Sequence, residues 1–251
     1  MDRVGFVGLG DIGAPIARRI RAAGFPTVLW ARRASALDAF PDFARAATPS
    51  ALGAACDVVG ICVFDDAGLR EVLLGTDGVL AGMARGGAVL IHSTASVQVC
   101  AEIAEAAAPR GVAVLDAPVS GARGGAEAGT LTVMVGGDQD AYERVLPVLR
   151  SFGSDVHLLG PLGSGQAMKA LNNVLFFATG RLAALAVETG EALGMDADVV
   201  AAVLRMGSAR SFALELMVDR GRLPSAAVVA KDTALFRELR ERAGLSPTVF
   251  E

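Results

Sequence analysis

Three glycines near the start of the chain have the spacing of a phosphate-binding turn. They stand in "VGFVGLGDIG", where Gly8, Gly10 and Gly13 follow an apolar run and precede a helical one. Gly8 suits a tight turn, Gly10 lets a pyrophosphate approach the backbone, and Gly13 lets the helix pack closely on the strand. Unpaired N–H groups at the start of that helix favour an anion. The segment predicts a dinucleotide site rather than a plain glycine-rich turn; its remaining members are Leu9, Asp11 and Ile12.

The end of the second apolar run bears on which dinucleotide binds. An acidic residue there is typical of NAD sites, because it accepts the ribose 2′-hydroxyl. This chain has "WARR" instead, with no acid before Asp38. Arg32 and Arg33 suit a 2′-phosphate, so the sequence favours NADP, with NAD possible; the alternative is two solvated arginines at a strand end. Val63 and Phe64, at the end of the third run, are expected to line the same site.

A later helical segment carries polar groups that its apolar pattern does not explain. Residues 163–175, "GSGQAMKALNNVL", place Lys169, Asn172 and Asn173 among apolar residues. Lys169 and Asn173 are four residues apart, so a helix presents both on one face and both can reach one ligand. One interpretation of this pattern is that the helix lines a pocket. The alternative is that Lys169 extends out of a packed helix into solvent.

The elements that must position these residues follow from the pattern of apolar runs. Six runs have strand length: residues 4–7, 27–33, 57–64, 87–94, 112–119 and 131–137. Helical stretches separate most of them: residues 34–40, 66–74, 97–108 and 139–151. This alternation predicts an α/β fold with a Rossmann-type, doubly wound parallel sheet.

The pattern changes near residue 160, after which no convincing strand remains. One long helix is expected over about 165–194, and further helices follow it. The sequence therefore predicts a dinucleotide-binding domain over 1–160 and an all-helical C-terminal domain over 161–251, joined through the long helix.

Composition excludes several classes of protein. The net charge is -4, whereas nucleic-acid binding requires a concentrated basic face. The three cysteines, Cys56, Cys62 and Cys100, have neither metal-ligand spacing nor an even-numbered disulfide pattern,, so we expect no metal site and a reducing, cytoplasmic location. The longest apolar helical stretch, about 170–187, is interrupted by Arg181 and two asparagines, which indicates a core helix rather than a membrane span.

The middle of the chain resembles a known family. Residues 116–137, "DAPVSGARGGAEAGTLTVMVGG", resemble the substrate-binding signature of the β-hydroxyacid dehydrogenases, whose members include 3-hydroxyisobutyrate dehydrogenase and several semialdehyde reductases. "GLGDIGAPIARRI" is similar to the N-terminal fingerprint of that family, "GSGQAMKALNN" to its catalytic helix, and "KD" at 231–232 to its late lysine motif. The four motifs stand in the family's order, and the resemblance runs from residue 4 to about 247.

The resemblance implies roles for the residues that hold the substrate and move the proton. Lys169 matches the catalytic lysine that exchanges a proton with the reacting oxygen, and Asn173 matches the asparagine that orients the substrate. Ser120, Gly121 and Ala122 match the turn that holds the substrate carboxylate. Ala122 stands where the family usually has a glycine, which narrows the allowed backbone.

The resemblance also implies contacts to the nicotinamide end of the cofactor. Thr94 matches the residue near the nicotinamide ribose, and Lys231 matches the lysine that reaches over the nicotinamide, with Asp232 capping or orienting its segment. His92 stands where an acid is common, and we expect a structural role for it. Arg123 either adds charge to the substrate turn or is a solvated loop arginine.

The predicted activity is therefore hydride transfer between NADP and a small β-hydroxy acid or its semialdehyde, in a protein expected to form a homodimer. An imine reductase of the same architecture is one alternative, and Lys169 weighs against it. A dinucleotide-binding protein without turnover is the other. The chain ends earlier after the "KD" motif than is usual in the family, which puts enclosure of the substrate and stability of the dimer in question.

Overall fold

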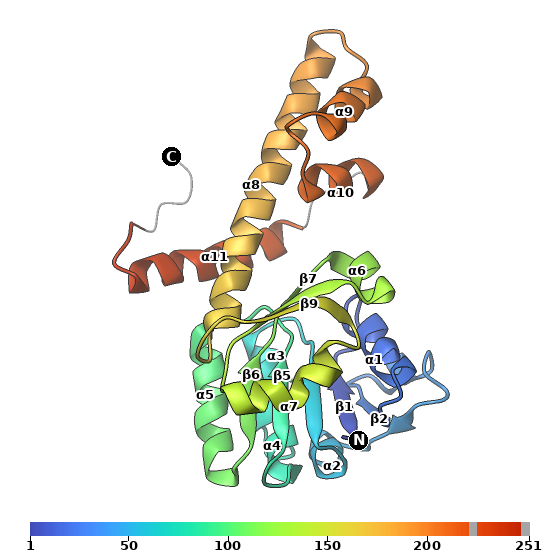
Figure 1. The fold of residues 1–251 in the computed structure, drawn as a ribbon, viewed down its shortest axis with the longest axis vertical. Coiled ribbons are helices and arrows are strands. Elements are labelled where there is room, and N and C mark those ends of the chain that lie inside the picture. The colour runs from blue at the N-terminus through green and yellow to red at the C-terminus, as the bar shows by residue number, and fades with distance from the viewer. Residues whose placement is uncertain (221–224, 247–251) are drawn as a thin grey trace. The chain divides into compact units, whose positions relative to one another are not determined.

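The computed structural model describes the backbone of residues 1–220 and 225–246 (Figure 1). The chain divides into two compact units, Met1–Lys169 and Ala170–Glu251. The division falls inside one long helix, α8 (Ser164–Ala192), close to the helix expected from the sequence.

The first unit is built on a six-stranded parallel sheet. Its strands are β1 (Val4–Val7), β2 (Thr27–Trp30), β3 (Ala44–Arg45), β4 (Val58–Ile61), β5 (Ala88–Ile91) and β6 (Ala113–Asp116). Their order is β3-β2-β1-β4-β5-β6. The chain winds outward from β1 in both directions, which leaves a crevice beyond the carboxyl ends of β1 and β4, where doubly wound sheets bind ligands. The Rossmann-type fold expected from the sequence is confirmed.

Helices cover both faces of this sheet, because neighbouring strand residues point to opposite faces (Figure 1),. Phe6 belongs to the core cluster on one face and Val7 to the cluster on the other. The Val7 face is covered by α2 (Pro49–Ala55), α3 (Asp66–Leu74), α4 (Val79–Gly82) and α5 (Val97–Ala107). The Phe6 face is covered by α1 (Gly13–Ala22), α7 (Gln139–Leu149) and a small second sheet.

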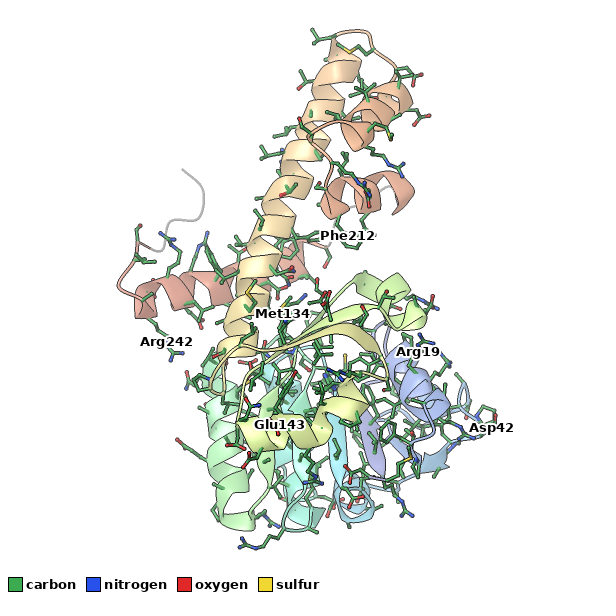
Figure 2. All side chains as sticks on the ribbon, viewed as in Figure 1. Arg19, Asp42, Met134, Glu143, Phe212 and Arg242 are labelled. Atoms are coloured by element: carbon green, nitrogen blue, oxygen red, sulfur yellow. The ribbon has the colours of Figure 1, made fainter. Side chains whose placement is uncertain are left out.

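The second sheet corrects one expectation. The run at 131–137 was expected to be the sixth strand of the parallel sheet, but β8 (Leu131–Val135) pairs with β7 (Val119–Ser120) and β9 (Gly153–Leu158) instead. The chain passes through β7 and α6 (Ala122–Ala128) after β6, so β8 returns antiparallel to β7. Arg19 on α1 donates to the carbonyl of Ala128 and ties α6 to the first helix (Figure 2). The expected helix over 34–40 is a short 3₁₀ helix, Ala34–Leu37.

The second unit consists of the later turns of α8 with α9 (Ala197–Met206), α10 (Phe212–Arg220) and α11 (Ala226–Arg242). Glycine permits the close approach of α8 to α9, because a Cβ built at Gly190 would lie 2.8 Å from Cγ2 of Val200. The ring of Phe176 on α8 lies 6.1 Å from that of Phe212 on α10 (Figure 2). The all-helical character expected after residue 160 is confirmed in the described part of this unit.

Helix α8 has an unusual distribution of side chains. Leu175 and Leu182 are 69% and 67% exposed, whereas Gln166 and Asn173 are buried. Among the described residues, α8 is the one helix whose length and composition would allow it to cross a membrane, and 17% of its most apolar window is buried within the chain. Leu175 and Leu182 therefore face outward from this chain.

Candidate active site

A cavity of about 610 Å³ opens at the carboxyl ends of β1, β2 and β4. It lies where the sheet topology predicts a ligand. Seven of the residues expected to bind the dinucleotide line it together: Gly8, Leu9, Gly10, Arg32, Arg33, Val63 and Phe64. Asp11, Ile12 and Gly13 belong to the same turn but lie outside the cavity lining.

The glycine turn fits a bound pyrophosphate. Gly8 has φ +92°, and a Cβ there would lie 2.1 Å from the carbonyl oxygen of Cys62. A Cβ at Gly13 would lie 1.9 Å from the carbonyl oxygen of Gly8. At Gly10, by contrast, a Cβ would meet no heavy atom within 4 Å, so the space beside the turn is open. No side chain caps the first turn of α1, which leaves its N–H groups to an anion,.

Two charged residues face each other at the rim of this cavity. Nη1 of Arg32 lies 3.5 Å from Oε2 of Glu71 on α3, and both side chains are largely exposed. Glu71 was not predicted as a site residue, because it belongs to no motif and its partner Arg32 lies 39 residues away in the sequence. The indole of Trp30 also lines the cavity, and it is the one tryptophan of the chain.

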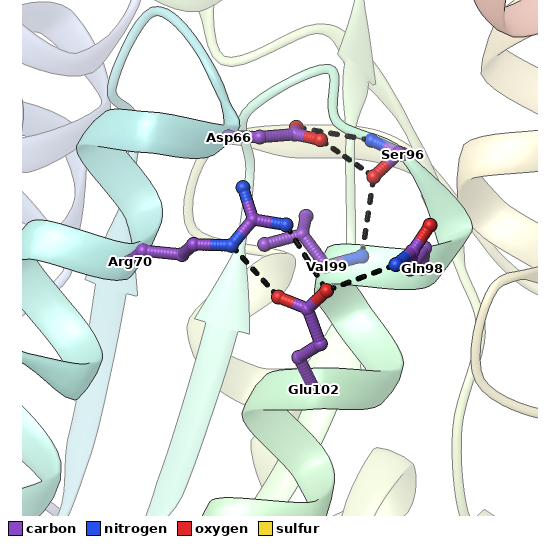
Figure 3. A network of polar contacts seen from close by, with 6 residues as sticks. All are labelled: Asp66, Arg70, Ser96, Gln98, Val99 and Glu102. Carbon is purple, nitrogen blue, oxygen red and sulfur yellow. Dashed lines mark hydrogen bonds and ion pairs between the residues drawn. The ribbon is translucent and has the colours of Figure 1, made fainter.

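The loops that follow β4 and β5 are joined to each other (Figure 3). Ser96 donates from Oγ to Oδ2 of Asp66 at 2.5 Å and from its backbone N–H to Oδ1 at 3.1 Å. The same hydroxyl accepts from the N–H of Val99 and so caps α5. Asp66 begins α3, so the two helix starts are locked together. Phe64 and Thr94 lie two residues before Asp66 and Ser96, so this contact restrains the two loops that carry them.

A second contact between α3 and α5 supports the first. Arg70 donates to both carboxylate oxygens of Glu102, at 2.7 and 3.1 Å, and Gln98 donates to Glu102 at 3.2 Å (Figure 3). These hydrogen bonds lower the pKa of Glu102 and raise that of Arg70. The pair is solvent-exposed, so its contribution is mainly orientation of the two helices.

His92 is a structural residue, as the sequence led us to expect. Its Nδ1 donates to the carbonyl of Ala117 at 2.9 Å. Its ring stacks on Phe6 with a centroid distance of 6.0 Å and meets the edge of Phe152 at 5.4 Å. Burial lowers the pKa of the imidazole to about 4, so His92 is neutral near pH 7 and does not act as a proton donor.

The turn expected to hold a carboxylate has strained backbone. Gly121 has φ +128° and Ala122 has φ +54°, and Ala122 is the one non-glycine residue with positive φ in the part of the chain that is described. Ser120 ends β7 directly before this turn. Nε of Arg123 lies 2.7 Å from Oε1 of Glu127, and its Nη1 lies 3.8 Å from Oδ1 of Asp11; all three side chains are largely exposed.

The first turn of α8 is held by buried polar groups that the sequence did not reveal. Asp116, at the end of β6, is fully buried and accepts from the N–H groups of Gly163 and Gln166 at 2.7 and 2.6 Å. Burial raises the pKa of the Asp116 carboxyl to about 6, against the opposing effect of these hydrogen bonds. The carboxyl acts as an N-terminal acceptor for α8 supplied by a distant strand.

The expected catalytic residues lie on both sides of the unit boundary. Lys169 is the last residue of the first unit. In the second unit, Asn173 donates from Nδ2 to Oδ2 of Asp232 at 2.6 Å and accepts from Asn172 at 2.9 Å. Nζ of Lys231 lies 3.5 Å from Oδ1 of Asp232. The structure thus joins Asn173, Lys231 and the buried Asp232 within the second unit.

The described residues hold no group of three or more side chains suited to a metal ion. Burial raises the pKa of the Cys56 and Cys62 thiols to about 12 and that of Cys100 still further. Thiols with such pKa values stay protonated at neutral pH and are poor nucleophiles, so cysteine chemistry does not arise at this site.

Comparison with known proteins matches both parts of the chain. Residues 3–160 match the family described as the NAD binding domain of 6-phosphogluconate dehydrogenase. Residues 163–250 match the one described as NAD-binding of NADP-dependent 3-hydroxyisobutyrate dehydrogenase. The two matches meet at the start of α8.

Individual relatives agree with these matches. The chain is 38% identical over 226 residues to NAD-dependent L-serine dehydrogenase of Pseudomonas aeruginosa, covering 86% of this chain and 73% of that protein. The crystal structure of a 3-hydroxyisobutyrate dehydrogenase from Salmonella typhimurium is 31% identical, with a TM-score of 0.86 over 97% of this chain and 88% of that one. Psf3 in complex with NADP⁺ and 2-OPP is 28% identical, with a TM-score of 0.87 over 94% and 86%.

Proposed function

The chain belongs to the β-hydroxyacid dehydrogenase family, and from that premise we propose that it is an NADP-preferring dehydrogenase of a small β-hydroxy acid, or reductase of the corresponding semialdehyde. Family membership supports NAD(P)-dependent oxidoreduction of hydroxy acids. The preference for NADP, the catalytic role of Lys169 and the class of substrate are the proposal.

The observation that carries the proposal is the distribution of lysine. The chain has 23 lysines and arginines together, and only Lys169 and Lys231 are lysines. Arginine occupies every other cationic position of the chain. The guanidinium does not deprotonate in proteins, whereas an ammonium group does. A residue that must give and take back a proton therefore has to be the lysine.

The residues divide the reaction among them as follows. A bound nicotinamide supplies or accepts the hydride. In reduction, Nζ of Lys169 gives a proton to the carbonyl oxygen that becomes the hydroxyl, and in oxidation the same atom takes the hydroxyl proton. Asn173 orients the reacting oxygen. Ser120 and the backbone N–H groups of the following turn hold the substrate carboxylate.

The charge around the adenosine end supports the preference for NADP. Arg32 and Arg33 line the cavity at the end of β2, where an acidic residue is typical of NAD sites. A 2′-phosphate placed there would accept charge-assisted hydrogen bonds from the guanidinium groups. The carboxylate of Glu71 already pairs with Arg32, and this competes with the phosphate.

A substrate panel with paired lysine variants tests the proposal. Glyoxylate, succinic semialdehyde, methylmalonate semialdehyde and a cyclic imine are assayed with NADPH and with NADH by absorbance. Lys169→Arg keeps the positive charge, but a guanidinium does not release a proton near neutral pH, so kcat should fall by about 10²- to 10⁴-fold. Lys231→Arg is the matched control: it weakens cofactor binding but leaves proton transfer intact.

Affinity for NADPH is measured separately, from the emission of Trp30 inside the cavity, and should change little in Lys169→Arg. Equal turnover by Lys169→Arg and wild type refutes the assigned role. Turnover of the imine alone indicates an imine reductase, and binding without turnover of any compound indicates a dinucleotide-binding protein.

We further propose that a second copy of the chain covers the outward face of α8. Burial of an exposed leucine contributes about 1.5–3 kcal/mol, and Leu175, Leu182 and Leu185 are all exposed on this helix. Arg181 and the buried Asn173 disfavour lipid around it. Light scattering of the purified chain should give twice the monomer mass, and Leu175→Glu should lower it; a monomeric wild type contradicts this assembly.

A further inference from the structure

The buried side-chain amide of Gln166 links the start of α8 to the loop that follows β5. The side chain of Gln166 accepts at Oε1 from the N–H of Ala95 at 3.0 Å and donates from Nε2 to the carbonyl of Ser93 at 2.8 Å. Gln166 and Ser93 are 2% and 3% exposed. The two hydrogen bonds fall on either side of Thr94, so they fix the backbone of that residue directly.

The same residue fixes the turn of α8 that carries Lys169. Gln166 precedes Lys169 by three residues, so the two lie next to each other on the helix surface. The backbone N–H of Gln166 donates to Asp116, which holds the start of the helix. One end of the helix is thus tied to β6, and the side-chain hydrogen bonds of Gln166 to residues 93 and 95 set the rotation of the helix about its own axis.

The loop is also tied to its neighbour. Oγ of Ser93 accepts from the N–H of Val63 at 2.9 Å, and Val63 lines the cofactor cavity. A continuous set of hydrogen bonds therefore runs from the cavity wall through Ser93 to Gln166. All these residues belong to the first unit.

We propose that Gln166 is a positioning residue for the reaction: it sets the distance between the nicotinamide held beside Thr94 and the proton carried by Lys169. The inference rests on the proposed function and deepens it. Both polar atoms of the Gln166 side chain are already hydrogen-bonded to backbone groups. It acts by holding the two elements that carry Thr94 and Lys169, and hydride and proton transfer both depend on that separation.

The experiment replaces the amide while keeping its volume. Gln166→Met removes both hydrogen bonds, and Gln166→Glu keeps the acceptor for Ala95 but not the donor to Ser93. A misplacement of the reacting groups by about 1 Å lowers the reaction rate on the order of 100-fold. We therefore expect kcat to fall by about 10- to 100-fold in Gln166→Met. The NADPH dissociation constant, read from Trp30, should change by less than about threefold, since the cavity itself is intact.

Two further readings separate positioning from a general structural role. The isotope effect on kcat with NADPH deuterated at the transferred position should increase, because hydride transfer becomes the slower step. Gln139→Met is the matched control: this exposed glutamine on α7 contacts Glu143 and lies outside the site, so its kcat and isotope effect should equal those of wild type.

The outcomes are distinguishable. A wild type without turnover on any substrate of the panel overturns the proposed function, and the inference with it. A wild type that turns over, together with a Gln166→Met protein that binds NADPH normally and retains kcat, overturns the positioning role alone. If Gln166→Met does not fold, Gln166→Glu is judged by the same two readings, and kcat equal to that of wild type overturns the inference.

Discussion

Asp116 should give the first unit a measurable pH dependence of stability. Its carboxyl is fully buried, and burial raises its pKa from the ordinary value of 3.8 to about 6. One pKa unit corresponds to about 1.4 kcal/mol, so this shift corresponds to about 3 kcal/mol of unfolding free energy. Asp116→Asn removes the ionisation and keeps the shape of the side chain. One of the two acceptor oxygens becomes an NH₂ group, so the variant loses one hydrogen bond at every pH, and only the pH dependence of the difference is used.

The sign of the effect follows from proton linkage. Between pH 3.8 and about 6 the folded protein holds a proton on Asp116 that the unfolded chain has already released. Stability linked to this group is therefore fully present below pH 3.8 and is lost as the pH rises through 6. His92 contributes in the opposite direction, because burial lowers its pKa from 6.5 to about 4 and the stability linked to it is lost as the pH falls.

Urea unfolding of wild type and Asp116→Asn between pH 4 and pH 8 measures this effect. Emission of Trp30 is the appropriate signal, since it lies in the same unit as Asp116. His92 is present in both proteins, so its contribution cancels in the difference between their unfolding free energies. That difference should shift by up to about 3 kcal/mol in favour of the variant as the pH rises. A difference that is flat with pH refutes the assignment of a raised pKa to Asp116.

Two further predictions concern the turn and the cavity rim. Ala122→Gly relieves a left-handed backbone that costs an L-residue about 1–2 kcal/mol, while the more flexible unfolded chain of the variant offsets about 0.4–1 kcal/mol of that gain. The unfolding free energy should therefore rise by about 0.5–1 kcal/mol, whereas Ala128→Gly, within α6, should lower it. A loss of stability in Ala122→Gly contradicts the claim that the backbone at Ala122 is strained. Glu71→Gln releases Arg32 from an exposed ion pair worth about 0.2–1 kcal/mol, so the NADPH dissociation constant should fall by about two- to fivefold while that of NADH stays unchanged; an equal gain for both cofactors would show that Arg32 does not meet a 2′-phosphate.

Most of the sheet was predictable from the sequence because its central strands are buried on both faces. β1, β4 and β5 are continuous runs of apolar residues, and such runs carry a signal that does not depend on their partners. The residues of a strand do not show which strand it pairs with. For that reason β8 was assigned from the sequence to the parallel sheet instead of the second sheet. The two-residue strands β3 and β7 are too short to show a pattern.

The parts of the candidate site that could be predicted are those whose residues are separated by a characteristic number of positions in the sequence. The glycine turn and the Lys169–Asn173 pair repeat known patterns at fixed intervals. Glu71 and Gln166 have no such spacing, since their partners lie 39 residues away in the first case and 71 and 73 residues away in the second. Contacts between residues so far apart in the sequence form only when the chain folds, so no local pattern predicts them. Asp116 lies inside a recognised motif, yet its role as acceptor for α8 depends on residues 47 and 50 positions later.

The start of α8 is held by polar groups for a physical reason. Apolar contacts are not directional, so they would keep the helix against the sheet without fixing its rotation. Hydrogen bonds lose strength steeply when their geometry is distorted, and in a buried site an unmade bond costs about 1–3 kcal/mol. Asp116 and Gln166 make a rotated helix costly, because any rotation leaves buried donors and acceptors unpaired. The burial that raises the pKa of Asp116 thus accompanies the hydrogen bonds that hold α8, and with it Lys169, in one orientation.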